Sequence, residues 1–199
     1  MKRVLNKLPT EPSKKALVVN YLLLIIIVAV NCYILWGLFG PRLSLEVQKA
    51  TQNPPVLPQS SSVQSPPAVN RLIIPSIYVD TKINEGAGEE AEVDGVWRRP
   101  GTGTPSLGSN TAIAGHRFTY QGASTFYNLD QVKVGDEIGV WYDQKFYAYS
   151  VSEIRIVDPN DKTVESESDQ SKLTLYTCTP LWTTNQRLVV IALPKEQIQ

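Results

Sequence analysis

Hydrophobic residues follow two different patterns along this chain, one continuous and one broken into short runs. The continuous pattern covers Leu17 to Phe39, which holds no charged side chain and consists mainly of Leu, Ile and Val. About 23 residues at a rise of about 1.5 Å each are long enough to cross the ~30 Å hydrocarbon core of a bilayer. We therefore predict a transmembrane helix over residues 17–39.

The charges on either side of this segment predict its orientation. Basic residues dominate the stretch before it, where Glu11 is opposed by Lys2, Arg3, Lys7, Lys14 and Lys15. Because positively charged flanks stay in the cytoplasm, residues 1–16 are expected inside the cell and the rest outside, in a single-pass protein of the cell membrane. A cleaved signal peptide is the alternative. Its apolar core is normally about 7–15 residues long and ends at a small-residue site, which is not found after Ala29.

Residues 40–69 are predicted to link this anchor to a folded domain. Pro54–Pro67 reads PPVLPQSSSVQSPP, which is rich in Pro, Ser and Gln and offers little surface to bury. Such a composition resists helix and sheet and is typical of an extended tether. An ordered arm wrapped on the domain is the alternative interpretation.

From Arg71 onward, short apolar or alternating runs replace the continuous pattern. We expect strands at Leu72–Ile74, Ile77–Val79, Thr111–Ala114, Glu137–Tyr142, Phe146–Ile156, Leu173–Thr177 and Leu188–Leu193. Turn sequences such as Pro100-Gly101 and Gly135-Asp136 separate them, and only Ser124–Leu129 has the pattern of a helical turn. Many short strands at this spacing indicate an all-β sandwich or barrel with one short helix.

The composition supports one globular domain and disfavours one class of partner. Hydrophobic residues make up 42% of the chain, which is enough for a packed core. The 19 basic and 19 acidic residues are unevenly distributed: residues 1–70 hold 7 basic and 2 acidic ones, which leaves 12 and 17 for residues 71–199. A mildly acidic domain lacks the basic face of nucleic-acid-binding proteins, so nucleic acid is not an expected partner.

One histidine and one cysteine stand out in the predicted domain. His116 and Cys178 each follow an apolar run, so both are expected at strand ends, where a rigid backbone presents a side chain to a cleft. Arg187 opens the next apolar run and could lie beside Cys178. The structural alternatives are a packed cysteine, a satisfied histidine and an arginine that extends from a strand end. A metal site is disfavoured because one His and one Cys cannot complete a tetrahedral set of ligands.

Four short motifs in this region resemble those of the sortase family. Thr174–Cys178 reads TLYTC and continues TPLWTTNQRLVV, which is similar to the sortase TLxTC strand end followed by an arginine on the next strand. Ile113–Arg117 reads IAGHR, like the family's histidine segment. Arg71–Asp80 (RLIIPSIYVD) and Arg99–Asn110 (RPGTGTPSLGSN) are similar to its opening IPxIxVD segment and its Pro/Gly stretch. The resemblance covers residues 70–194, with the motifs in the family's order.

The resemblance implies an eight-stranded β-barrel with one or two short helices, formed by an extracellular catalytic domain at residues 70–199. It also implies a cysteine transpeptidase in which Cys178 is the nucleophile, His116 the general acid/base and Arg187 the oxyanion-stabilising or substrate-positioning group. Thr177 is expected to help bind the substrate or shape the oxyanion site, whereas Arg117 is given no role. The motifs look more similar to those of class C, D or E sortases than to those of class A.

The implied substrates are secreted proteins with a C-terminal sorting signal of the LPxTG type, cleaved through a thioester and transferred to an amine of the cell wall or of a pilin. No cofactor is expected, because the three side chains supply nucleophile, proton and charge stabilisation. Some sortases bind Ca²⁺ through acidic loop residues, for which Glu165, Glu167 and Asp169 are candidates, although a solvated acidic loop is the preferred interpretation. A hydrolytic cysteine peptidase and a non-catalytic tethered binding module are the alternative functions.

Overall fold

The computed structural model describes residues 13–58, 65–88, 95–119 and 122–195. The chain divides into two compact units, one up to residue 41 and one from residue 42 onward. Most of the residues predicted to be cytoplasmic, 1–12, lie outside the described part of the chain. The domain boundaries drawn from the sequence stay predictions.

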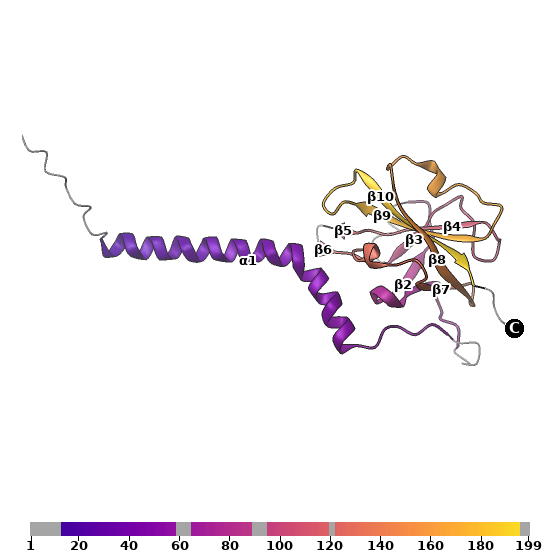
Figure 1. Cartoon of the computed structure of the whole chain (residues 1–199), viewed down its shortest axis with the longest axis horizontal. Helices are drawn as coiled ribbons and strands as arrows, with labels where there is room; N and C mark the ends of the chain where they lie inside the picture. The colour runs from indigo at the N-terminus through magenta and orange to yellow at the C-terminus, as the bar shows by residue number, and fades with distance from the viewer. Residues whose placement is uncertain (1–12, 59–64, 89–94, 120–121, 196–199) are drawn as a thin grey trace, which may run out of the picture. The chain divides into compact units, whose positions relative to one another are not determined.

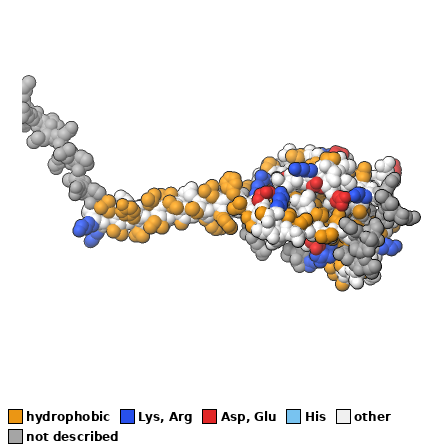
Figure 2. Space-filling model, turned by 60° about the horizontal axis from the view of Figure 1, so that its bottom comes forward, with side chains coloured by type: hydrophobic (Ala, Val, Ile, Leu, Met, Phe, Trp, Pro, Cys, Tyr) orange, Lys and Arg blue, Asp and Glu red, His pale blue; other side chains and the backbone are white. Residues whose placement is uncertain are grey.

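The first unit is dominated by the helix α1 (Lys14–Thr51) (Figure 1). Over Lys14–Gly37 this helix is long and apolar enough to cross a membrane, judged by length and composition. Figure 2 shows hydrophobic side chains on the face in view, and the exposed apolar residues follow one another from Leu22 to Val28, so they occupy every side of the helix; none of this stretch is buried in the protein. An apolar surface around a whole helix is unfavourable in water but suits lipid, and the helix satisfies its own backbone hydrogen bonds.

The helix extends further than the sequence suggested, because residues 40–51 were assigned to the linker and are helical. Within the second unit, Leu45 is buried at 3% exposure, and Arg42 forms a 3.0 Å ion pair with Asp130. The hydroxyl of Tyr78 also donates to the carbonyl of Gln52 just after the helix. Tertiary contacts of this kind stabilise a helical end that composition alone does not predict.

The first residues after α1 lie against the domain. A Cβ added to Gly139 would stand 2.6 Å from Cδ2 of Leu57, so the Leu57 side chain covers that glycine. The predicted tether Pro54–Pro67 therefore begins as an ordered arm, which was the alternative interpretation of this stretch. Residues 59–64 of the tether lie outside the described residues.

The second unit contains a closed barrel of eight strands (Figure 1). Around the barrel the strands follow the order β1, β2, β3, β4, β9, β10, β8 and β7. The pairs β2–β3 and β4–β9 are parallel, and the remaining pairs are antiparallel. The barrel strands are β1 (Arg71–Ile74), β2 (Val79–Asn84), β3 (Val96–Arg98), β4 (Asn110–Ala114), β7 (Glu137–Tyr142), β8 (Lys145–Val157), β9 (Lys172–Thr179) and β10 (Gln186–Pro194). The expected all-β barrel is confirmed.

Several short elements differ from the sequence-based prediction. The strand expected at Ile77–Val79 begins only at Val79, as β2, because Pro75 opens the 3-10 turn η1 (Pro75–Ile77) and Tyr78 has a φ of 57°. The expected helical turn at Ser124–Leu129 is displaced to η3 (Leu129–Gln131), and η4 (Lys162–Val164) is a further turn. The short strand β3 and the hairpin of β5 (Phe118–Thr119) and β6 (Gly122–Ala123) were not predicted. Two or three residues are too few to show an alternating pattern.

The core lies inside the barrel and follows from the alternation of side chains along each strand. In β7, Ile138 and Val140 are fully buried and point inward. In β9 the inward positions are Leu173 and Leu175, also at 0% exposure. The side chains that alternate with them, such as Thr174 and Tyr176, therefore face outward, and that outer surface carries the candidate site.

We expect Leu175→Ala to lower the free energy of unfolding by about 2–5 kcal/mol, because it leaves a cavity in the barrel core. Chemical denaturation of the full-length protein in detergent measures the change. Leu193→Ala is the control: Leu193 is 43% exposed, so its loss should cost about 0.5 kcal/mol or less. Equal losses in the two variants would contradict the assignment of Leu175 to the core.

Candidate active site

His116 and Cys178 are brought together by the parallel pairing of β4 with β9. The register matches Ala114 with Tyr176, and His116 and Cys178 each follow two residues later. Two further hydrogen bonds continue this seam: the amide of Gly115 donates to Tyr176 O at 3.2 Å, and the hydroxyl of Thr177 donates to Gly115 O at 2.7 Å. The two side chains therefore stand at the same end of neighbouring strands.

Arg187 reaches the same place from the other side of β9. In the antiparallel pair of β9 and β10, Arg187 lies directly opposite Cys178. Directly opposed residues present their side chains on one face of a sheet, and here it is the outer face of the barrel. Arg187 Nη1 donates to the carbonyl of Thr184, in the loop that joins the two strands, at 2.9 Å and to that of Gln186, the first residue of β10, at 3.2 Å.

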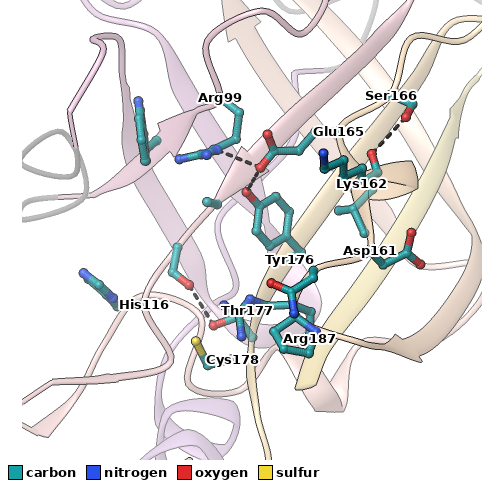
Figure 3. A pocket seen from close by; sticks show the side chains of 16 residues that line it. Arg99, His116, Asp161, Lys162, Glu165, Ser166, Tyr176, Thr177, Cys178 and Arg187 are labelled. Carbon is teal, nitrogen blue, oxygen red and sulfur yellow. Dashed lines mark hydrogen bonds and ion pairs between the residues drawn. The ribbon is translucent and has the colours of Figure 1, made fainter. Parts of the chain in front are cut away.

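A pocket of about 750 Å³ lies over this face, and the predicted residues His116, Thr177, Cys178 and Arg187 all line it (Figure 3). His116, Cys178 and Arg187 are partly exposed, as groups that meet a substrate must be. Thr177 is buried at 2% exposure, and its hydroxyl is bonded to Gly115. The observed contact of Thr177 is therefore with the neighbouring strand, and its expected role in substrate binding stays a prediction.

Gly115, which precedes the histidine, permits a close contact. A Cβ at this position would lie 2.6 Å from the ring of Phe126, and the Phe126 amide donates to His116 O at 3.0 Å. The close neighbour of this glycine is thus an aromatic ring. This packing leaves little freedom to the backbone that carries His116.

The loop between β8 and β9 forms the opposite wall of the pocket. A small apolar cluster of Val164, Val189 and Ile191 anchors it, separate from the barrel core. Asn110, at 0% exposure, adds two hydrogen bonds: its Nδ2 donates to Val164 O at 3.0 Å and to Ser166 O at 2.9 Å. Its Oδ1 accepts from the hydroxyl of Thr174 at 2.7 Å, so the polar groups of this buried amide are engaged.

Glu165, which lies between Val164 and Ser166, lines the pocket and forms a network of charged and polar contacts there (Figure 3). Its carboxylate accepts from Arg99 Nε at 2.7 Å and from the hydroxyl of Tyr176. The Arg99 guanidinium also stacks over the Trp97 ring, 4.0 Å from the ring centroid. These contacts join Arg99, just after β3, and Tyr176 of β9 to the loop and form a polar wall of the pocket, which Figure 3 shows apart from Cys178.

Asp161 lies on the rim of the pocket at the start of η4. Hydrogen bonds from the hydroxyl and the amide of Thr163, at 2.6 and 2.9 Å, lower the pKa of this carboxyl below its usual value. The Asp161 carboxylate therefore stays ionised at lower pH than an ordinary aspartate, because its lowered pKa favours the charged form.

The three candidate Ca²⁺ ligands do not converge. Glu165 points into the main pocket and is paired with Arg99, whereas Glu167 and Asp169 line a different hollow near Gly101. Within the described residues, no group of three or more His, Cys, Asp or Glu side chains is arranged to hold a metal ion. Nearness in the sequence was misleading here because the loop turns between Glu165 and Glu167.

Sequence reasoning missed the wall of the pocket, which is formed by Asn110, Arg99 and Tyr176 as well as Glu165. One signal was available: Asn110 opens a short strand that ends in the apolar run Ala112–Ala114, and a buried amide needs hydrogen-bond partners. The partner of Arg99 lies 66 positions away in the sequence, and nothing in the local pattern indicates it.

We expect Asn110→Asp to loosen this wall, because a carboxylate cannot donate to the carbonyls of Val164 and Ser166. The free energy of unfolding should fall by about 1–3 kcal/mol, and amide hydrogen exchange should rise at residues 164–167. Asn160→Asp, at an exposed position of the same loop, is the control and should leave exchange unchanged. Equal exchange in both variants would show that Asn110 does not anchor the loop.

Comparison with known proteins agrees with this geometry. Residues 72–195 match the family described as the sortase domain. Sortase A of Bacillus anthracis is 24% identical over 131 residues, which cover 66% of this chain and 61% of that protein. Among solved structures, sortase C1 of GBS pilus island 1 is 30% identical with a TM-score of 0.60, over 65% of each chain. A Clostridium perfringens sortase D5 transpeptidase is 28% identical with a TM-score of 0.57, over 67% of this chain and 82% of that one.

The matches to the Bacillus anthracis protein and to the GBS enzyme thus span less than two thirds of those proteins. The family match, in contrast, runs from the second residue of β1 to just beyond the end of β10 and includes the strand ends that carry His116, Cys178 and Arg187. This chain belongs to the sortase family of cysteine transpeptidases.

Proposed function

We propose that this protein is a membrane-anchored sortase that cleaves the sorting signal of secreted proteins and transfers the acyl group to an amine. One observation carries the proposal: a thiol, an imidazole and a guanidinium from three strand ends line one pocket. The family supplies the reaction class. The non-catalytic binding module is disfavoured because such a module has no need to retain all three groups at one site.

In the proposed first step, the thiolate of Cys178 attacks the carbonyl carbon of the scissile peptide bond. The carbonyl oxygen becomes an oxyanion, and the imidazolium of His116 gives its proton to the departing amine. Collapse of the tetrahedral intermediate breaks the C–N bond and leaves a thioester on Cys178. The second half reverses these roles: an incoming amine attacks the thioester, His116 takes up its proton, and the Cys178 thiolate leaves.

Arg187 is proposed to stabilise the oxyanion or to position the substrate. Its place directly opposite Cys178 on β10 supports this role, because an arginine there brings a permanent positive charge close to the proposed nucleophile. The hydrogen bonds from Nη1 to Thr184 O and Gln186 O fix the orientation of the guanidinium. A donor held in place in this way needs little reorganisation when negative charge develops.

We propose that the apolar part of α1 is a single-pass anchor with the amino terminus in the cytoplasm and the barrel outside. A barrel anchored at the membrane can contact other proteins that are anchored there, and we propose that its substrates are such proteins and carry a sorting signal of the LPxTG type. The acceptor is proposed to be an amine of the cell wall or a lysine of a pilin. Hydrolysis is the competing outcome, since water can also attack the thioester.

The test incubates the full-length protein, in detergent, with LPxTG-type peptides, with and without an added amine such as triglycine. We expect a thioester adduct by mass spectrometry and an amide product when the amine is present. Cys178→Ala should abolish both adduct and product while the fold is kept. Cys32→Ala, which removes the other cysteine, is the matched control and should retain both.

The results of this assay separate the candidate functions. Free acid as the sole product, at every amine concentration, would identify a hydrolytic peptidase and contradict the transpeptidase. An adduct that still forms in Cys178→Ala would remove Cys178 from the mechanism. A peptide library run in the same format defines the preferred signal.

Arg187→Lys is expected to reduce kcat/KM at least tenfold, because a point ammonium does not reproduce the planar fork of donors. Steady-state kinetics of amide formation measure the loss. Arg71→Lys is the control: Arg71 pairs with Asp80 on the barrel surface and is not among the residues that line the pocket, so its turnover should be unchanged. Near-normal turnover in Arg187→Lys would demote Arg187 to a packing role.

A further inference from the structure

Arg117, the residue after His116, is buried at 5% exposure in spite of its charge. Its guanidinium contacts three partners: Nη1 donates to Thr179 Oγ1 at 2.8 Å, Nη2 pairs with Asp130 Oδ2 at 2.7 Å, and Nε donates to Tyr127 O at 3.3 Å. Neither Arg117 nor Thr179 is among the described residues that line the pocket. Arg117 therefore lies behind the pocket that His116 and Cys178 line.

The contact with Thr179 continues the register of β4 and β9. Thr179 follows Cys178 directly, as Arg117 follows His116, so the bonded side chains stand one position beyond the two proposed catalytic groups. One position before them, the hydroxyl of Thr177 donates to Gly115 O. The strand β4 ends at Ala114, and beyond that point side-chain hydrogen bonds link this seam on both sides of the His116 and Cys178 positions.

The charge of Arg117 is balanced from a separate part of the domain. Asp130, in η3, pairs with Arg117 and also accepts from Arg42 Nη2 at 3.0 Å. A buried guanidinium without such a counter-ion would be strongly destabilising. The bonds to Asp130 and to Tyr127 O hold the Arg117 side chain against the 127–130 segment, which leaves Nη1 directed at Thr179.

We propose that Arg117 is a positioning residue that fixes the separation of His116 from Cys178 by bonding to Thr179. This inference rests on the proposed function, since it assigns a role within the same site. The backbone of His116 has no strand of its own, so its distance from β9 depends on the contacts that flank it. Proton transfer between two groups is sensitive to small displacements, and a shift of about 1 Å can cost a hundredfold in rate.

The test compares Thr179→Val, which keeps the shape and removes the hydroxyl, with Thr179→Ser, which keeps the hydroxyl. Both are made in a Cys32→Ala background, so that Cys178 is the single thiol. For Thr179→Val we expect kcat to fall about tenfold with the KM for the peptide unchanged, whereas Thr179→Ser should stay close to the parent. Arg117→Lys, which keeps the charge beside Asp130 but loses the fork, should behave like Thr179→Val if it folds.

A second readout needs no sorting peptide. The rate at which iodoacetamide alkylates Cys178 is measured across the range in which thiols and imidazoles titrate. The difference between the pH profiles of alkylation in the parent and in His116→Ala measures the effect of the imidazole on the reactivity of the thiol. Thr179→Val should move the pH profile toward that of His116→Ala, and Thr179→Ser should not. Melting temperatures show whether a variant has lost its fold instead.

Two results would overturn the inference, and they are distinguishable. If Thr179→Val and Thr179→Ser have the same kcat and the same alkylation profile, Arg117 does not position His116, and the proposed function is untouched. If His116→Ala leaves the parent's alkylation profile unchanged, the His116 and Cys178 pair itself is wrong, and both proposals fall together.

Discussion

The parallel pairing of β4 with β9 is the constraint on which the site depends. It brings together residues far apart in the chain and sets which side of the sheet each one faces. A slip of one residue would turn Cys178 into the barrel and bring Thr177 or Thr179 to the outside. Polar side chains form hydrogen bonds along this seam, beginning with the bond from Thr174 to Asn110. They disfavour such a slip, because these buried polar groups would lose their hydrogen-bond partners.

The site is formed by two kinds of structure, the strand ends of the barrel and the loop between β8 and β9. The groups proposed to carry the chemistry stand at strand ends of a closed barrel, where backbone pairing limits their movement. The opposite wall comes from the loop between β8 and β9, which is attached through Val164 and through the amide of Asn110. The pocket joins a reactive end at Cys178 to a charged end at Glu165.

Much of this arrangement could be predicted from the sequence, and the remainder could not for identifiable reasons. Long alternating runs gave the position of strands such as β7 and β9, and the motifs around His116 and Cys178 pointed to one pocket. The turn at Pro75 and the three-residue strand β3 were missed because local patterns need more residues to become visible. The helical end of α1, the arm at Leu57 and the pairing of Glu165 with Arg99 all depend on distant partners, which the sequence does not show.

The separation of the small apolar cluster from the barrel core has a consequence for engineering. Val164, Val189 and Ile191 pack with each other and not with the residues inside the barrel. A segment from a related enzyme could replace residues 158–171 as a cassette, provided that it supplies an apolar side chain at position 164 and backbone carbonyls within reach of Asn110. Chimeras built on these attachment points would change one wall of the pocket without repacking the barrel core beneath the strand ends of Cys178 and Arg187.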